Sequence, residues 1–315
     1  MRSPAKTDRA LASPYAHRRR VQDGGSVTRT TTAKSLLLMM LCALACATAG
    51  HADEIETEHL FGFTTGSDVG NVGEREFEGS TTARLAKRSG TYRAATQMFS
   101  AEFVPLPNLR TEYSATIAAH DIAGISGFDN RRQFAVEGFS ADFRYRLLDR
   151  ATAPFGFAIG AEPHWSRIDE ASGAAVRQYG SDFVAAFDKE IVPDRIVAAF
   201  NLLYQPEVSR AKATGQWSQE STSGIAAAVM AQLSPGVFFG AEGRYLRHYD
   251  GIGFDGFDGH AGFLGPTLYI KLSPRAWIAA AWSAQIAGRA TNAPGSLDLV
   301  NFERHQVRFL FGLNF

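Results

Sequence analysis

The sequence predicts an all-β fold: a transmembrane antiparallel up-and-down β-barrel of about twelve strands. From Glu74 onward, segments of about a dozen residues alternate apolar and polar side chains, and a period of two residues is that of a β-strand. Short turns and longer polar loops separate these segments in succession, an asymmetry typical of membrane barrels. No stretch after residue 52 holds about 18 consecutive apolar residues, so we expect no membrane-spanning helix.

Taking odd and even positions separately locates each expected strand. In the third, Tyr113 and Ile117 share one face, and Arg110 and Glu112 share the other. The first half of the fourth is out of phase with its second half, which indicates a β-bulge near Gly138. The expected strands cover residues 74–86, 91–104, 109–121, 133–147, 154–166, 178–190, 195–207, 217–233, 236–249, 260–272, 276–288 and 305–315.

The connections between these strands are of two kinds. Short turns, most of which contain proline, are expected at 105–108, 149–150, 192–195, 234–236 and 273–275. Longer polar or glycine-rich loops are expected at 122–132, 167–177, 208–216, 250–259 and 289–304. In bacterial barrels the short turns face the periplasm, and an even number of strands places both ends of the barrel on that side.

The last strand ends the chain with an apolar face that no later segment can bury. This face carries Val307, Phe309, Phe311, Leu313 and Phe315. The pattern resembles the closing strand of Gram-negative outer-membrane β-barrels, which ends in an aromatic residue. The resemblance implies a location in the bacterial outer membrane, among its lipid and lipopolysaccharide. It also implies that Phe309, Phe311, Leu313 and Phe315 form the signal read by the barrel-assembly machinery.

A soluble alternative reverses this polarity. A large secreted lipocalin-like barrel or a sandwich would turn the same apolar face inward, and one sequence does not show which face is inside. The terminal Phe315 favours the membrane barrel. Small residues among the charged positions, such as Gly156 and Gly240, favour it too.

Residues 1–52 have the composition of a targeting segment. The apolar run 36–47 follows a basic flank and precedes a small-residue site at Gly50-His51-Ala52, which is typical of a secretory signal peptide. A complete signal peptide would also begin at Val27, so residues 1–26 are either a start site assigned too early or an extended basic leader. Both cysteines lie in this segment, so no disulfide is expected in the exported chain.

Residues 53–73 lie between the signal peptide and the barrel segment, 74–315. Three glutamates, at 54, 56 and 58, precede Leu60-Phe61-Gly62-Phe63 and a glycine-rich stretch. Three arrangements are open: a periplasmic lead-in, a short plug inside the lumen, or an extra strand.

The face opposite the apolar one is expected to line a lumen of mixed charge. It carries Glu76, Glu78, Arg84, Arg110, Glu112, Asp142, Arg144, Arg146, Glu162, Asp182, Asp188, Glu190, Glu242, Arg244, Lys271 and Arg308. Twelve strands fall between the filled eight-stranded barrel and the open sixteen-stranded porin. The charges therefore suit either a narrow passage for small solutes or a lattice of ion pairs that closes the barrel.

We expect a passive channel or transport-related protein for small solutes, with a closed structural or surface-interaction barrel as one alternative. The 32 basic and 32 acidic residues cancel, which argues against a nucleic-acid partner. No cofactor is expected. Asp250, Asp255 and Asp258 have the chemistry of a weak Ca²⁺ site, but a flexible surface loop accounts for them better, so no metal is expected either.

His164 and Ser166 give a second alternative, a lipid hydrolase. Two residues apart on one strand, a base and a nucleophile share a face about 7 Å apart. The pair resembles that of lipolytic outer-membrane barrels, the phospholipase A and lipid A deacylase families. The Asn-Gly that follows the serine in those families is replaced here by Arg167-Ile168. The reading that competes with catalysis places both residues at the membrane interface, beside a belt tryptophan, Trp165.

Overall fold

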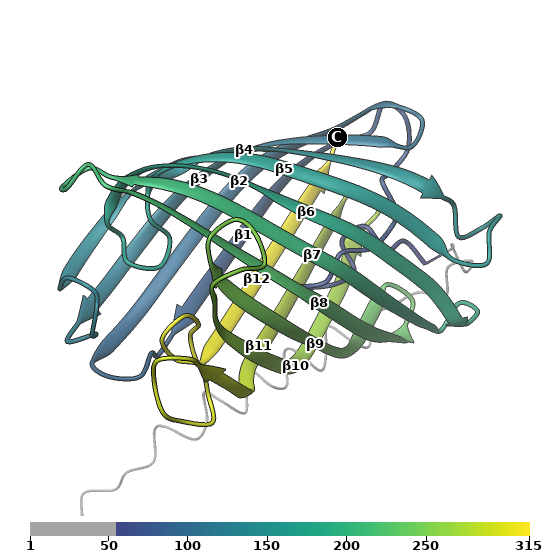
Figure 1. The fold of residues 1–315 in the computed structure, drawn as a ribbon. Helices are drawn as coiled ribbons and strands as arrows, with labels where there is room; N and C mark the ends of the chain where they lie inside the picture. Colours follow the sequence, from purple (N-terminus) through teal and green to yellow (C-terminus); the bar gives the residue numbers. More distant parts are fainter. Residues whose placement is uncertain (1–54) are drawn as a thin grey trace, which may run out of the picture. The chain divides into compact units, whose positions relative to one another are not determined.

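The computed structural model describes residues 55–315, which form one closed antiparallel barrel (Figure 1). Each strand pairs with the next in sequence, and β1 pairs with β12 to close the sheet. The strands are β1 (Arg75–Leu85), β2 (Thr91–Leu106), β3 (Leu109–Ala123), β4 (Arg131–Leu148), β5 (Gly156–Ile168), β6 (Ala175–Val192), β7 (Ile196–Ala211), β8 (Trp217–Ser234), β9 (Val237–Asp250), β10 (Phe257–Ser273), β11 (Ala276–Ala290) and β12 (His305–Asn314). The expected signal peptide lies outside the described residues.

The predicted fold class, a barrel of twelve antiparallel strands, is confirmed. The predicted β-bulge is confirmed as well: the β3–β4 register shifts between Thr116 and Ile117, which pair with Gly138 and Val136. Glu137 is the extra residue, and it turns into the barrel beside Gly138 because the bulge reverses the alternation there. Residues 55–315 contain no helix long and apolar enough to cross a membrane.

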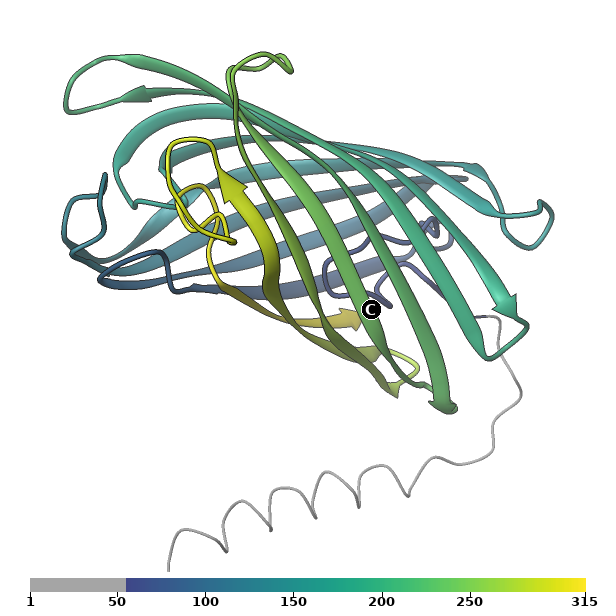
Figure 2. The ribbon, with the colours of Figure 1, turned by 60° about the horizontal axis from the view of Figure 1, so that its bottom comes forward.

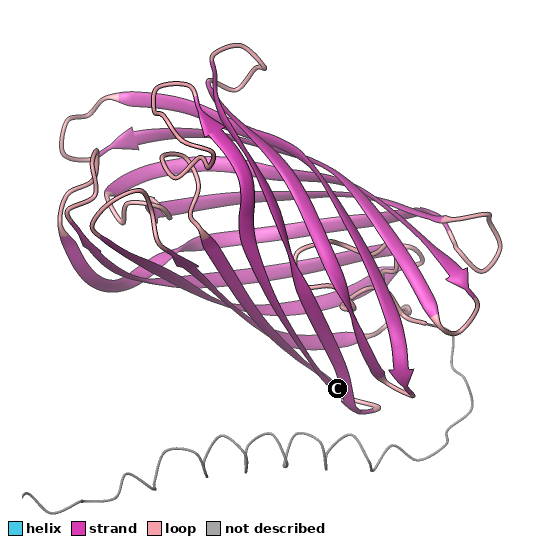
Figure 3. Cartoon of the chain, turned by 90° about the horizontal axis from the view of Figure 1, so that it is seen from below, coloured by secondary structure: helices cyan, strands magenta, loops and turns pink. Residues whose placement is uncertain are grey.

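The two ends of the barrel differ, as Figure 3 shows by its loops. We call the end that holds the connections after even-numbered strands the turn end, and the other the loop end. Four of these connections have two or three residues, but the β4–β5 connection, expected as a short turn at 149–150, runs over residues 149–155. Asn108 and Gly236 have φ angles of 65° and 75°, the left-handed backbone that two of the tight turns require. The C-terminus lies at the turn end, because β12 runs in that direction.

The outer surface of the barrel is apolar. Large side chains at every second strand position are exposed, among them Phe139 (56%), Phe143 (42%) and Phe309 (44%). Their neighbours on the inner face are buried, as Arg110 (4%) and Arg144 (8%) are. A charged lumen beside an apolar exterior is the polarity of a barrel surrounded by lipid.

The segment before β1 lies inside the barrel. Residues 55–70, which we call the plug, run as irregular chain through the lumen near the turn end, and Figure 2 shows them enclosed by the strands. Ile55, Leu60 and Val69 are at most 3% exposed, although the plug belongs to no strand. The plug therefore fills the interior that the wall itself leaves unfilled.

The polarity of the barrel gives a first prediction. Phe309→Arg places a cation against lipid near the middle of β12 and should lower the free energy of unfolding by about 2–4 kcal/mol. Urea unfolding in lipid vesicles, followed by tryptophan fluorescence, measures this loss. Phe309→Leu is the matched control and should cost far less. Equal stabilities of the two variants would contradict the proposed contact between Phe309 and lipid.

Candidate functional site: the plug and the lumen

The plug packs its apolar side chains against one half of the barrel wall. Leu60 and Phe61 are 1% and 4% exposed and form a single buried cluster with residues of β7–β12. The wall contributes Val197, Ala199, Ala228, Met230, Phe238, Tyr269, Trp277, Ala279 and Leu310. This inner apolar patch stabilises the docked plug, because a buried Leu or Phe side chain contributes about 1.5–3 kcal/mol.

Backbone groups of the plug are held by side chains of the wall. Glu242 on β9 accepts three hydrogen bonds from consecutive N–H groups, those of Gly62 (2.6 Å), Phe63 (2.8 Å) and Thr64 (2.6 Å). Asn201 on β7 accepts from the N–H of Thr65 (2.7 Å) and donates to its carbonyl (2.8 Å). The wall thereby satisfies polar backbone groups that would otherwise be buried without partners.

The beginning and the end of the plug are joined at the turn end. Asp188 on β6 accepts from the Ser67 N–H and from the Thr57 hydroxyl, both at 2.6 Å. Arg150, in the β4–β5 turn, donates to Asp188 and to Asp68 at 2.9 Å each. These ionic hydrogen bonds are about twice as strong as neutral ones, so they fix the plug where it enters the lumen.

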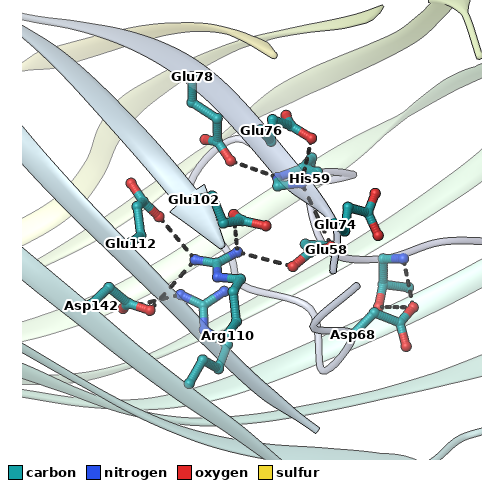
Figure 4. Close-up of polar contacts among 12 residues, drawn as sticks. Glu58, His59, Asp68, Glu74, Glu76, Glu78, Glu102, Arg110, Glu112 and Asp142 are labelled. Carbon is teal, nitrogen blue, oxygen red and sulfur yellow. Dashed lines mark hydrogen bonds and ion pairs between the residues drawn. The ribbon is translucent and has the colours of Figure 1, made fainter. Parts of the chain in front are cut away.

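Arg110 lies at the centre of an ion-pair cluster where the plug meets β1–β4 (Figure 4). Its guanidinium lies 3.1–3.5 Å from carboxylates of the plug and of three strands, those of Glu58, Glu102, Glu112 and Asp142. Arg144 contacts the second oxygen of Asp142 at 3.4 Å. The inner wall of β1–β4 is therefore charged, whereas that of β7–β12 is mostly apolar, and the plug contacts both.

His59 extends from the plug toward β1. Its Nδ1 lies 3.3 Å from Glu78, and its Nε2 lies 3.6 Å from Glu76, so the ring stands between two carboxylates of one strand (Figure 4). The ring stacks on Trp277 with centroids 4.5 Å apart. Burial lowers the pKa of His59, and the nearby Arg110 lowers it further. Burial raises the pKa of Glu58, and Glu102 adds to the effect.

Two glycines allow the plug and the wall to approach this closely. A Cβ at Gly62 would overlap the side chain of Ala281, so only glycine fits where the plug passes β11. A Cβ at Gly312 on β12 would overlap both Glu76 and Trp277. Glycine is needed at both places for space, since neither has a positive φ.

At the loop end, the β11–β12 loop folds inward. Arg84 on β1 lies 2.6 Å from Glu170 of the β5–β6 loop and 3.5 Å from Glu303 of the β11–β12 loop. Lys87 donates to the backbone carbonyls of Val300 (2.9 Å) and Asn301 (3.3 Å). These contacts narrow the lumen at the end opposite the plug.

The structure places most of the sequence-predicted lumen residues at or beside the plug. Those that contact it are Glu76, Glu78, Arg110, Arg146, Asp188, Glu242, Arg244 and Arg308. Glu112, Asp142 and Arg144 join it through the Arg110 cluster, and Glu190 lies 3.8 Å from Arg150. Glu162 and Asp182 are opposite each other on β5 and β6, and Lys271 is exposed near the turn end of β10.

The two residues of the hydrolase alternative are not brought together as a catalytic pair. His164 Nε2 lies 3.4 Å from Glu207 of β7, across Gly180. Among residues 55–315 no hydrogen bond joins His164 to Ser166. The aromatic neighbour Trp165 stacks on Phe139 on the outer face, with ring centroids 6.2 Å apart.

Several residues of the site were not selected from the sequence. His59, Arg150 and Trp277 carry no pattern that separates them from ordinary polar or aromatic positions. Asn201 carried a signal, because it alternates with Phe200 and Leu202 on the seventh strand. Glu102 did carry a signal, because it alternates with Phe99 and Phe103 on the second strand. Glu58 belongs to the glutamate series at 54, 56 and 58, which marked the segment and not its contacts.

The chain belongs to a family of unknown function, DUF6662, which it matches over residues 53–315. A search of curated protein sequences finds no match.

Solved structures that resemble this barrel include a bacterial outer membrane channel. The COG4313 outer membrane channel from Pseudomonas putida F1 has a TM-score of 0.54 and 12% identity, over 79% of this chain and 98% of that one. The translocator domain of the autotransporter NalP from Neisseria meningitidis has a TM-score of 0.44 and 13% identity, over 90% and 98%. The NanC porin has a TM-score of 0.42 and 11% identity, over 76% and 98%. The likeness to the COG4313 channel shows that the chain has the fold of an outer-membrane β-barrel, as its closing strand predicts.

The close approach at Gly62 gives a second prediction, on plug docking. Gly62→Val should displace the plug, because overpacking of this kind costs about 1–3 kcal/mol. Residues 55–315 contain no cysteine, so Ser67→Cys, buried at 0% exposure, supplies a single reporter thiol. Maleimide should label it about tenfold faster, or more, in the Gly62→Val background.

Gly253→Val is the matched control for this experiment. Gly253 lies in the β9–β10 loop at the loop end, and a Cβ there meets only Asp255, at 3.5 Å or more. It should leave the labelling rate unchanged. Equal rates in the two valine variants would show that Gly62 does not control docking.

Proposed function

We propose that the protein is a passive outer-membrane channel for small solutes and that the plug controls its conductance. The observation that carries this proposal is the plug itself, a segment outside the strands that is held inside the lumen by polar side chains of the wall. The strand residues that bond to it include Glu76, Glu78, Arg110, Asp188, Asn201, Glu242 and Arg308. An irregular segment docked by hydrogen bonds and ion pairs can leave its site without breaking the strand ladder. The barrel wall therefore tolerates both a closed and an open lumen.

The inner wall behind the plug supports a passage. Filled eight-stranded barrels close their interior with side chains of the wall. Here the wall beneath Leu60 and Phe61 includes small residues, Ala199, Ala228 and Ala279, and the plug occupies the remaining space. Removal of the plug would leave a space lined by the inner apolar patch, with its small and large side chains, on one side and by the Arg110 cluster on the other.

The likeness to a solved channel points to the same class of function. The COG4313 protein from Pseudomonas putida F1 is described as an outer membrane channel, and its barrel is the similar one reported above. A closed structural barrel remains the competing proposal, with the plug as permanent filling. The two differ in whether the docked plug ever leaves the lumen.

Weakening one anchor of the plug distinguishes these proposals and gives a third prediction. Glu242→Gln replaces the charged acceptor of three plug N–H groups, and hydrogen bonds to charged groups contribute about 1.5–3 kcal/mol. In planar lipid bilayers the purified variant should be open roughly 10- to 150-fold more of the time than the wild type, the equilibrium change that this energy produces.

Glu162→Gln is the matched control, because Glu162 is an inner-face glutamate of β5 that lies opposite Asp182 and makes no hydrogen bond or ion pair with the plug among residues 55–315. It should leave the opening frequency close to that of the wild type. The wild type and both variants, Glu242→Gln and Glu162→Gln, are first shown to be folded by their gel migration. If none of the three then conducts, the channel is refuted and the closed barrel is favoured.

A further inference from the structure

Acidic side chains outnumber basic ones where the plug meets β1–β4. Among the described residues there, six buried carboxyl groups stand against two buried guanidinium groups, those of Arg110 and Arg144. The carboxyl groups belong to Glu58, Glu76, Glu78, Glu102, Glu112 and Asp142. Burying so much unbalanced charge is costly unless protons or a further cation neutralise it.

The two arginines do not reach all of these carboxylates. Arg110 contacts Glu58, Glu102, Glu112 and Asp142, and Arg144 contacts Asp142 again. Glu76 and Glu78, by contrast, have only His59 as an ionisable basic neighbour within 4 Å in the described chain. The part of the cluster that lacks a permanent cation is therefore the part that surrounds the histidine.

The spacing around His59 suits a shared metal ion better than direct hydrogen bonds. One ligand atom from each of His59, Glu76 and Glu78 lies within 4.8 Å of the others. Nδ1 lies 3.3 Å from Glu78 Oε1 and Nε2 lies 3.6 Å from Glu76 Oε2, beyond the usual length of a hydrogen bond. These are different nitrogens of one ring, so an ion would bind one of them together with its near carboxylate, and the other carboxylate would reach that ion from within the 4.8 Å span. Ligands of a tetrahedral ion with bonds of about 2.0–2.2 Å are spaced by about 3.4 Å.

A second observation concerns an unpartnered oxygen. Glu78 is 7% exposed, and its Oε1, the atom that faces His59, has no hydrogen-bond partner among the described residues. Buried polar atoms normally find a partner, so an oxygen aimed at a histidine without one suggests a ligand between them.

The surroundings fix these side chains in position. The ring of His59 is stacked on Trp277, and Trp277 Nε1 donates to Glu76 Oε1 at 2.5 Å. The other oxygen of Glu76 is the one that faces the histidine. Outer contacts that orient the ligands in this way are typical of metal sites in proteins.

We propose that His59, Glu76 and Glu78 bind a divalent transition-metal ion, which joins the plug to β1. One imidazole nitrogen and carboxylate oxygens form a donor set that suits Zn²⁺ and related ions better than Ca²⁺ or Mg²⁺, which prefer oxygen alone. Two ligands come from the wall and one from the plug, so the ion stabilises the docked plug. Binding of the ion is independent of conductance, whereas an effect on opening rests on the proposed function.

Isothermal titration of the full exported protein, stripped of metal with a chelator, tests the site and gives a fourth prediction. Zn²⁺ should bind saturably with one ion per chain, and Mg²⁺ should not compete. His59→Gln and Glu78→Gln should each weaken Zn²⁺ binding about tenfold or more. His164→Gln is the matched control, since His164 contacts Glu207 and lies outside this cluster, and it should bind Zn²⁺ like the wild type.

The reporter thiol of Ser67→Cys adds a readout of the plug. Zn²⁺ should slow its maleimide labelling in the wild-type background and not in His59→Gln, with folding of each variant checked by gel migration. Absence of saturable Zn²⁺ binding, or equal binding by His59→Gln and the wild type, would overturn the site. Zn²⁺ binding in a protein without conductance would leave the site standing and refute the channel instead.

Discussion

The structure depends on one constraint: a strand in a closed barrel turns every second side chain inward, so charge that lipid excludes must be accommodated in the lumen. At the turn end the lumen is too narrow for these charges to remain free in water, and Glu76, Arg110 and Glu242 are each at most 4% exposed. Each must then find a partner of its own. The wall alone does not provide enough partners, and the plug supplies the rest.

The plug meets this need because it is irregular. In the strands, backbone N–H groups are used in the ladder and are not available to inward carboxylates. Residues 62–65 and Ser67 form no ladder, so their N–H groups are free to donate to Glu242, Asn201 and Asp188. The wall carboxylates and the plug backbone satisfy one another, which explains why a segment without regular structure is buried so completely.

How much the sequence predicts follows from the range of the interactions. Strand positions, the bulge near Gly138 and four of the five short turns were predictable, because alternation and turn residues are local signals. The turn expected at 149–150 was wrong, since the β4–β5 connection runs over residues 149–155. The contact of Glu242 with Gly62 joins residues 180 positions apart and leaves no local trace. The role of Val197 and Met230 could not be predicted either. Their apolar side chains point into the lumen because Leu60 and Phe61 of the plug cover them, and the sequence does not show that contact.

The balance between apolar and polar contacts bears on whether the plug can move. If the plug left, water entering the lumen would hydrogen-bond to Glu242, Asp188 and Asn201. The net cost would be about 0.5–1.5 kcal/mol for each bond to the Asn201 amide and about 1.5–3 kcal/mol for each bond to a carboxylate. The apolar contact of Leu60 and Phe61 has no such replacement, since water cannot compensate for exposed hydrocarbon. The polar contacts therefore determine where the plug sits, and the apolar contact adds to the free energy that keeps it there. A metal ion bound by His59, Glu76 and Glu78 would add to the free energy of plug docking. Because that addition depends on the concentration of the metal ion around the protein, the stability of the docked plug would change with it.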